Sequence, residues 1–267
     1  ITLDNGIGTI NNYVSGTPIP VSPVATTTYN MVGNVVDANG CSVAGSGSAT
    51  VTVNTPPASA VLSGAATICS GSSTDLIVTI TGGASPYTIT IDNGVGSINN
   101  YVSGTPIPVS SLATTTYAMV GNVTDANGCT VAGSGSALVT VNPSPTSAVL
   151  SGTATICSGT STDLIVTITG GVSPYTVTIN GIGTINNYVS GTPIPVSPGV
   201  TTIYDIVGNV TDASGCVVAG SGSATITVNP SPTATISGTT TICNGSATVL
   251  TVNFTGTGPW SFRYSDG

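Results

Sequence analysis

The sequence repeats itself at intervals of 87 or 88 residues, and this periodicity constrains the fold more than any other feature. Residues 1–55 align without a gap on residues 89–143 and differ from them at only ten positions. A unit that recurs with so few changes is one structural module, so the chain is a tandem array. We predict two complete repeats flanked by two partial ones, with the boundaries 1–55 (the C-terminal part of a repeat), 56–143, 144–229 and 230–267 (the N-terminal part of a repeat).

Each repeat has the residue pattern of β-strands throughout. Short runs of β-branched residues alternate with Thr and Ser and end at Gly, Pro or Asn-Gly, and no window has a helical period. In the repeat 56–143 we predict about seven strands, namely 60–62 continuing to 67–69, 75–81, 87–91, one or two irregular strands in 99–110, 116–125 and 137–142. With turn signals every 8–12 residues, this pattern predicts an all-β fold of tandem Ig-like β-sandwich repeats of about 88 residues.

The alternation also predicts which side chains fill the core, because successive side chains of a strand point to opposite faces. For the strands at 75–81 and 87–91 the inward residues are Leu76, Val78, Ile80, Tyr87, Ile89 and Ile91. Pro106 and Pro108 cannot donate a backbone hydrogen bond, so they favour a strand at the edge of a sheet.

The charged residues exclude most kinds of chemistry. The chain has nine Asp, one basic residue, Arg263, and no His, Lys, Glu or Gln, which leaves a net charge of -8. Without His, neither a Ser-His-Asp nor a Cys-His catalytic arrangement can form. A single Arg cannot provide a basic patch that binds nucleic acid. No apolar stretch approaches the roughly 18 residues that a membrane-spanning helix needs. We expect that the chain is not an enzyme, that it binds neither a cofactor nor nucleic acid, and that it does not insert into a membrane.

Six cysteines recur at two positions of the repeat. One position precedes the strand at 75–81 and its equivalents, and the other follows the turn between the last two strands. Closely spaced ligand pairs such as C-x-x-C are absent, so we expect disulfides and no metal site. The candidate disulfide residues are Cys41, Cys69, Cys129, Cys157, Cys216 and Cys243.

The pairing of these cysteines is open between two arrangements. Pairing inside a repeat, as Cys69–Cys129 and Cys157–Cys216, closes loops of about sixty residues and leaves the outermost cysteines to other chains. In a sandwich, however, the two turns lie at opposite ends of the strands, whereas disulfide Cα atoms lie within about 7 Å. If the repeats stack head to tail, Cys69–Cys216 can bridge a joint instead. A sequential pairing such as Cys41–Cys69 ranks below both.

The motifs along one repeat resemble those of a known family. They are Thr-Ile-Cys-x-Gly-x-Ser-x-x-Leu, Ser-Pro-Tyr, Thr-Thr-Thr-Tyr, Asn-Gly-Cys and Ser-Ala-x-Val-Thr-Val-Asn-Pro, and together they cover essentially the whole chain. This combination resembles the Ig-like repeats of very large Bacteroidetes surface and secreted proteins, including gliding-associated adhesins. The resemblance implies an extracellular or cell-surface array that serves as stalk, adhesin or fibre, with no catalytic residues. The last copy departs from the pattern at Gly258-Pro259-Trp260, where Ser-Pro-Tyr stands elsewhere.

Asp37, Asp125 and Asp212 open the turn before the second cysteine of each repeat. Their spacing resembles the start of a calcium loop, but the chain has no Glu to close one. We therefore predict Asx turns at these positions.

Tyrosines recur at the start of the next-to-last strand, as Tyr29, Tyr117 and Tyr204. This position predicts a tyrosine corner, in which the hydroxyl contacts the backbone. The single tryptophan, Trp260, is predicted to lie in the core.

Two classes of function remain. The first is an extracellular structural protein that forms a stiff rod or filament, with chains associating head to tail and side by side. The partial ends fit a version in which the front part of one chain's repeat meets the back part of the next. They fit equally well a longer continuous chain of which these residues are a piece. The second is an adhesin or surface-binding module of a larger secreted protein, in which the loops at 99–110 and their equivalents present a polar surface to glycans or another surface ligand.

Overall fold

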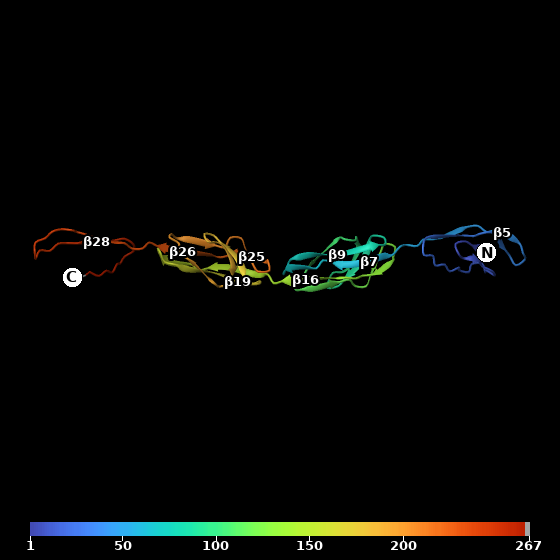
Figure 1. Ribbon diagram of the computed structural model, residues 1–267, viewed down its shortest axis with the longest axis horizontal. Coiled ribbons are helices and arrows are strands. Elements are labelled where there is room, and N and C mark those ends of the chain that lie inside the picture. Colours follow the sequence, from blue (N-terminus) through green and yellow to red (C-terminus); the bar gives the residue numbers. More distant parts are fainter. Residues whose placement is uncertain (265–267) are drawn as a thin grey trace. The chain divides into compact units, whose positions relative to one another are not determined.

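The structure is a computed structural model of the chain and describes residues 1–264 (Figure 1). Every regular element in this range is a β-strand, which confirms the predicted all-β, Ig-like fold. The described residues contain no helix that could cross a bilayer. The chain divides into two compact units, Ile1–Val141 and Asn142–Gly267, each with a hydrophobic core of its own. Residues 265–267 of the predicted partial repeat 230–267 lie outside the described range.

The repeat 56–143 contains more strands than the sequence predicts. The predicted strands at 75–81 and 87–91 are present as β9 and β10, whereas two other predicted strands are each broken into two. The elements are β7 (Pro57–Ser63), β8 (Ala66–Cys69), β9 (Ser73–Gly82), β10 (Tyr87–Ile91), β11 (Gly96–Tyr101), β12 (Pro106–Ser110), β13 (Thr115–Ala118), β14 (Asn122–Thr124), β15 (Thr130–Ala132) and β16 (Ser136–Asn142).

The predicted continuous strand at 60–69 is wrong, because the chain changes sheets at Gly64. Gly64 has a φ of 118°, and a Cβ atom there would lie 2.6 Å from the carbonyl oxygen of Asp75. Only glycine fits this position. As a result β7 pairs with β9, whereas β8 pairs with β16.

The predicted strand at 116–125 is broken in the same way. Gly121, with a φ of 69°, separates β13 from β14. β13 pairs with β16, whereas β14 pairs with β10 and β15. The alternation of apolar and polar residues indicates which face of a strand is buried but not which sheet the strand joins. The sequence pattern therefore does not predict the breaks at Gly64 and Gly121.

The repeat 144–229 has the same strands in the same order. They form a seven-stranded sheet, β21-β20-β24-β25-β17-β19-β22, and a three-stranded sheet, β18-β26-β23. Their bounds are β17 (Pro145–Ser151), β18 (Ala154–Cys157), β19 (Thr162–Gly170), β20 (Tyr175–Ile179), β21 (Gly183–Tyr188), β22 (Pro193–Val196), β23 (Thr202–Asp205), β24 (Asn209–Thr211), β25 (Val217–Ser221) and β26 (Ser223–Asn229). β12, which contains Pro106 and Pro108, lies at a sheet edge as predicted, and its counterpart β22 does so too.

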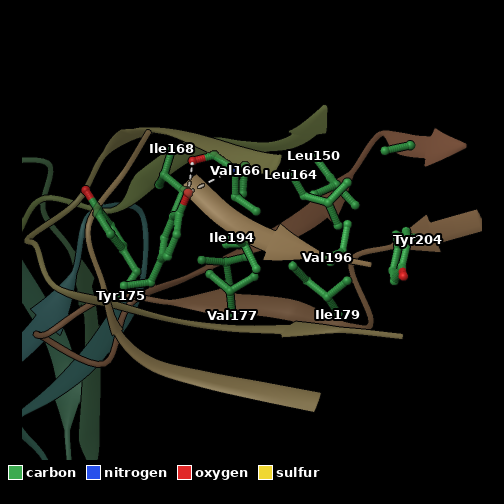
Figure 2. Close-up of a cluster of buried hydrophobic side chains, with 14 of the residues drawn as sticks. Leu150, Leu164, Val166, Ile168, Tyr175, Val177, Ile179, Ile194, Val196 and Tyr204 are labelled. Atoms are coloured by element: carbon green, nitrogen blue, oxygen red, sulfur yellow. Dashed lines mark hydrogen bonds between the residues drawn. The ribbon is translucent and has the colours of Figure 1, made fainter. Parts of the chain in front are cut away.

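Strands of different sheets enclose one core in each complete repeat, between two sheets in 144–229 and among three in 56–143. The six side chains predicted to point inward from β9 and β10 are at most 7% exposed, which confirms that prediction. In the repeat 144–229, Leu164 and Val166 of β19 lie opposite Val177 and Ile179 of β20 (Figure 2). Burying one such side chain contributes roughly 1.5–3 kcal/mol.

The two partial repeats have fewer and shorter strands. Their elements are β1 (Thr2–Leu3), β2 (Gly8–Thr9), β3 (Thr27–Asn30), β4 (Asn34–Val36), β5 (Ser42–Ala44) and β6 (Ser48–Val51) at the N-terminal side, and β27 (Ala234–Ser237) and β28 (Thr251–Phe254) at the C-terminal side. The pairing of β3 with β6 keeps the register of its counterpart in the complete repeat, with Tyr29 opposite Ala49 as Tyr117 is opposite Ala137. The same local pattern therefore has the same strand pairing in both copies.

We predict that Leu164→Ala lowers the free energy of opening of its own repeat by about 2–5 kcal/mol, because Leu164 is fully buried and the substitution leaves a cavity. Hydrogen exchange measured by mass spectrometry would show faster exchange in β19 and β20. Exchange in β9 and β10 serves as an internal control and should not change. Val149→Ala, at a position that is 42% exposed, should have little effect, and equal effects of the two substitutions would contradict the assigned core.

Candidate cross-linking and interaction sites

The turn before the second cysteine of each repeat is organised by an aspartate. One carboxylate oxygen of Asp125 accepts hydrogen bonds from the backbone amides of Asn127, at 2.9 Å, and Cys129, at 2.8 Å. Asp212 and Asp37 make the equivalent bonds in their turns. These contacts confirm the predicted Asx turns and fix the backbone of the cysteine that follows.

The second carboxylate oxygen of Asp125 connects this turn to the turn between β9 and β10. It accepts a hydrogen bond from the Ala84 amide at 3.0 Å, as Asp212 does from Val172 at 2.9 Å. Hydrogen bonds from backbone amides hold the pKa of Asp125 below its ordinary value of 3.8, and the bond from Ala84 has the largest effect. Burial acts in the opposite direction, and the amides of Cys129, Asn127 and Gly128 add smaller lowering effects. This carboxylate is ionised in the folded state and clamps two loops together.

The cysteines differ in oxidation state. Cys69 and Cys216 are disulfide-bonded, whereas Cys41, Cys129, Cys157 and Cys243 are thiols. The pairs proposed within a repeat are therefore not formed, since each of them needs Cys129 or Cys157. For the four thiols the predicted disulfides stay predictions, because a cysteine that pairs with another molecule is a thiol within a single chain.

The surroundings of Cys129 place it near a joint. Its sulfur lies 4.0 Å from the carbonyl oxygen of Asn54, near the end of the preceding partial repeat. Cys216 stands at the equivalent position of the next repeat and is 1% exposed. The second cysteine position is thus held at the end of the repeat by the aspartate turn.

The segment Tyr-Val-Ser-Gly-Thr, which occurs three times in the sequence, binds the edge of a core strand through its side chains. The Tyr101 hydroxyl accepts a hydrogen bond from the Val78 amide at 3.0 Å and donates one to the Thr105 carbonyl at 2.8 Å. The Ser103 hydroxyl accepts one from the Ile80 amide at 2.8 Å and donates one to the Ile80 carbonyl at 3.0 Å. We call this arrangement the Tyr-Ser clasp.

The clasp recurs in the repeat 144–229. Tyr188 and Ser190 accept hydrogen bonds from the amides of Val166, at 3.0 Å, and Ile168, at 2.7 Å. Burial raises the pKa of the Tyr188 hydroxyl. Sequence reasoning placed irregular strands here and missed the clasp, although the unchanged recurrence of Tyr, Ser and Gly was a signal that could have found it.

The predicted tyrosine corner is wrong. The ring of Tyr117 lies in the core, but its hydroxyl hydrogen-bonds to the Ser111 hydroxyl at 2.7 Å and not to the backbone. No hydrogen bond joins the hydroxyl of Tyr29 or Tyr204 to any residue in 1–264. The reason is local, because Pro23 and Pro198 occupy the place of Ser111 in the other copies and have no hydroxyl.

The predicted core position of Trp260 is also wrong. Its side chain is 45% exposed and stacks on Phe254, with 5.3 Å between ring centroids and 14° between ring planes. Its counterparts Tyr87 and Tyr175 are buried at 6% exposure by strands that the segment 230–264 does not contain.

We predict that Tyr188→Phe destabilises its repeat by about 1–3 kcal/mol, because it leaves the buried amide of Val166 without its partner. The matched control is Tyr204→Phe, which removes a hydroxyl without a hydrogen bond from an equally buried ring. Hydrogen exchange of β19 should accelerate in the first variant only. Similar exchange in both variants would show that the clasp does not stabilise the strand.

We predict that the contribution of Asp125 to stability depends on pH. Since its pKa is lower in the folded than in the unfolded state, the contribution is fully present above about pH 4 and is lost as the pH falls through the lowered value. Asp125→Asn should lower the urea midpoint near neutral pH, and the difference from the parent chain should shrink in acid. The exposed Asp75→Asn serves as the control, and a constant difference at all pH values would contradict the assignment.

No family model matches the chain, and no curated protein matches its sequence. Among solved structures, an I-band fragment of titin is similar, with 16% identity, a TM-score of 0.41 and coverage of 68% of this chain and 68% of its own. The fibronectin(III)-like modules of CbhA from Clostridium thermocellum are 14% identical and have a TM-score of 0.31, with coverage of 66% and 94%. The N-terminal eight Ig domains of Down Syndrome Cell Adhesion Molecule are 13% identical and have a TM-score of 0.39, with coverage of 87% and 33%. Similarity at these values carries no information about function.

Proposed function

We propose that this chain is a structural repeat protein that forms a stiff extracellular or cell-surface rod or filament, is stapled by disulfides and has no catalytic activity. The observation that carries the proposal is the repetition of one closed core. Leu76 and Val78 of one complete repeat are matched by Leu164 and Val166 of the next, and all four are fully buried. Repeats that are self-contained and nearly identical add length to a protein and add no new site.

The disulfide and the composition support an extracellular location. Cys69 and Cys216 are oxidised, and disulfides persist in oxidising compartments outside the cytosol. The chain has one Arg and no Lys, so it offers proteases that cleave at basic residues almost no site. Resistance to such proteases suits a protein that is exposed outside the cell.

One observation favours a second candidate, a glycan-binding adhesin module. A shallow groove occurs at the same place in both complete repeats, with a volume of about 370 Å³ beside Asn100 and about 360 Å³ beside Asn187. Each groove combines asparagine amides with proline and aliphatic side chains, for example Pro106 and Pro193. Such a mixed polar and apolar surface can bind a sugar, and its repetition would give several weak sites per chain.

Electron microscopy of the unreduced chain, with a reduced sample beside it, tests the first proposal. We expect long fibres whose axial repeat corresponds to one to three sequence repeats, and reduction should make them less stiff. Short dispersed particles that bind to a glycan array would contradict the filament and support the adhesin. Asn100→Ala combined with Asn187→Ala should leave the fibres unchanged if the filament proposal is correct, and should abolish glycan binding if the adhesin proposal is correct.

A further inference from the structure

The first cysteine position of a repeat lies beside the last residue of that repeat. Cys157 ends β18, which pairs in parallel with β26, and it is opposite Asn229. The amide of the next residue, Ser158, donates a hydrogen bond to the Asn229 carbonyl at 2.8 Å. The Ser231 hydroxyl donates one to the Ser158 carbonyl at 3.2 Å. The linker that leaves the repeat at Asn229 is therefore fixed to the turn that carries the first cysteine.

The second cysteine position lies at the opposite end of the repeat, where the repeat begins. Asp212, which opens the turn before Cys216, accepts a hydrogen bond from the Val172 amide at 2.9 Å. A Cβ atom on the neighbouring Gly171 would lie 3.0 Å from the backbone nitrogen of Pro145, the first residue of β17. The strands between the two ends span roughly 20 Å, whereas the Cα atoms of a disulfide lie within about 7 Å of each other. The two cysteines of one repeat are therefore not disulfide partners.

Both cysteine positions contact the same residue of the linker between repeats. Asn54 and Asn229 occupy equivalent positions near the end of their repeats. The sulfur of Cys129, in the repeat that follows Asn54, lies 4.0 Å from the Asn54 carbonyl oxygen. The equivalent carbonyl oxygen of Asn229 accepts the hydrogen bond of the residue after Cys157. Because the repeats are nearly identical, one asparagine carbonyl lies next to the first cysteine of its own repeat and to the second cysteine of the next.

Asn142 is the equivalent asparagine of the linker that connects the two complete repeats. The first cysteine of the repeat before it is Cys69, and the second cysteine of the repeat after it is Cys216. Both are oxidised. We infer that Cys69 and Cys216 form one disulfide across this linker, so that the first cysteine of a repeat is cross-linked to the second cysteine of the repeat that follows. The inference deepens the proposed function, on which its consequence rests that the link stiffens the rod by limiting bending at the linker.

Formation of this bond needs an oxidant that itself contains a disulfide, such as oxidised glutathione or a protein disulfide. An S–S bond forms between the sulfurs of Cys69 and Cys216, while the S–S bond of the oxidant breaks and its two sulfurs take up the two thiol protons. The chain loses two electrons, and the oxidant gains them and becomes two thiols. An extracellular compartment supplies such oxidants and preserves the bond.

The test maps the disulfides of the whole chain. The chain is oxidised with oxidised glutathione, its remaining thiols are alkylated, and it is digested with chymotrypsin, which cleaves after aromatic residues and leucine. The peptide 63–76 then carries Cys69 as its only cysteine, and the peptide 205–250 carries Cys216 and Cys243. An equal mixture of ¹⁵N-labelled and unlabelled chain, treated in the same way, distinguishes a bond within one chain from a bond between two.

We expect these two peptides to be linked, with both halves from the same chain, and we expect reduction to separate them. Cys216→Ser should abolish the link completely. Cys243→Ser is the matched control on the same peptide and should leave the link unchanged. Since Cys216 is buried and its replacement can disturb folding, Cys69→Ser is a second variant, in which the link should also be lost and Cys216 should become open to alkylation after denaturation.

Three results would overturn the inference, namely a link that persists in Cys216→Ser, a linked peptide with halves of different isotope content, or an oxidised parent chain in which Cys69 is alkylated. Fibres from a chain without the linked peptide would overturn this disulfide but leave the proposed filament standing. The linked peptide in a chain that forms no fibres would support the disulfide and contradict the filament.

Discussion

Closure of the two halves of a repeat over one core is the interaction on which the rest of the structure depends. The hairpin of β7 and β9 supplies Leu62, Leu76 and Val78, and the remaining strands supply the residues that face them. When both halves are present, these side chains leave water and the backbone groups between the halves pair. In the segment 230–264 the equivalent side chains of Ile236 and Leu250 are exposed.

The clasp and the aspartate turns hold the closed repeat together without charge pairs. The chain has one basic residue, so ion pairs cannot stabilise it broadly, and the polar contacts are made by hydroxyls, amides and isolated carboxylates. Tyr101 and Ser103 cover backbone groups at the edge of β9 that a neighbouring strand would otherwise bond. Asp125 joins two loops through backbone amides alone. A surface with few charged residues is also suited to contact between chains.

Much of the fold could be predicted from residue spacing. The inward positions from Leu76 to Ile91 follow from the alternation of apolar and polar residues, and the Asx turns follow from Asp at fixed distance before Gly and Cys. The missed features depend on contacts between distant segments. The sheet change at Gly64 is set by the Asp75 backbone, and the hydroxyl partner of Tyr117 is set by a serine that the other copies replace with proline.

The sequence by itself determined the repeat length, the all-β Ig-like class, the core positions and the absence of most catalytic residue types, because these depend only on local pattern and composition. The tertiary structure decided which sheet each strand joins, which polar side chains pair, which cysteines are oxidised and which apolar faces remain open. Those properties depend on distances between residues far apart in the chain. Trp260 illustrates the difference, since its pattern is that of a core residue but its burial requires strands from the other half of a repeat.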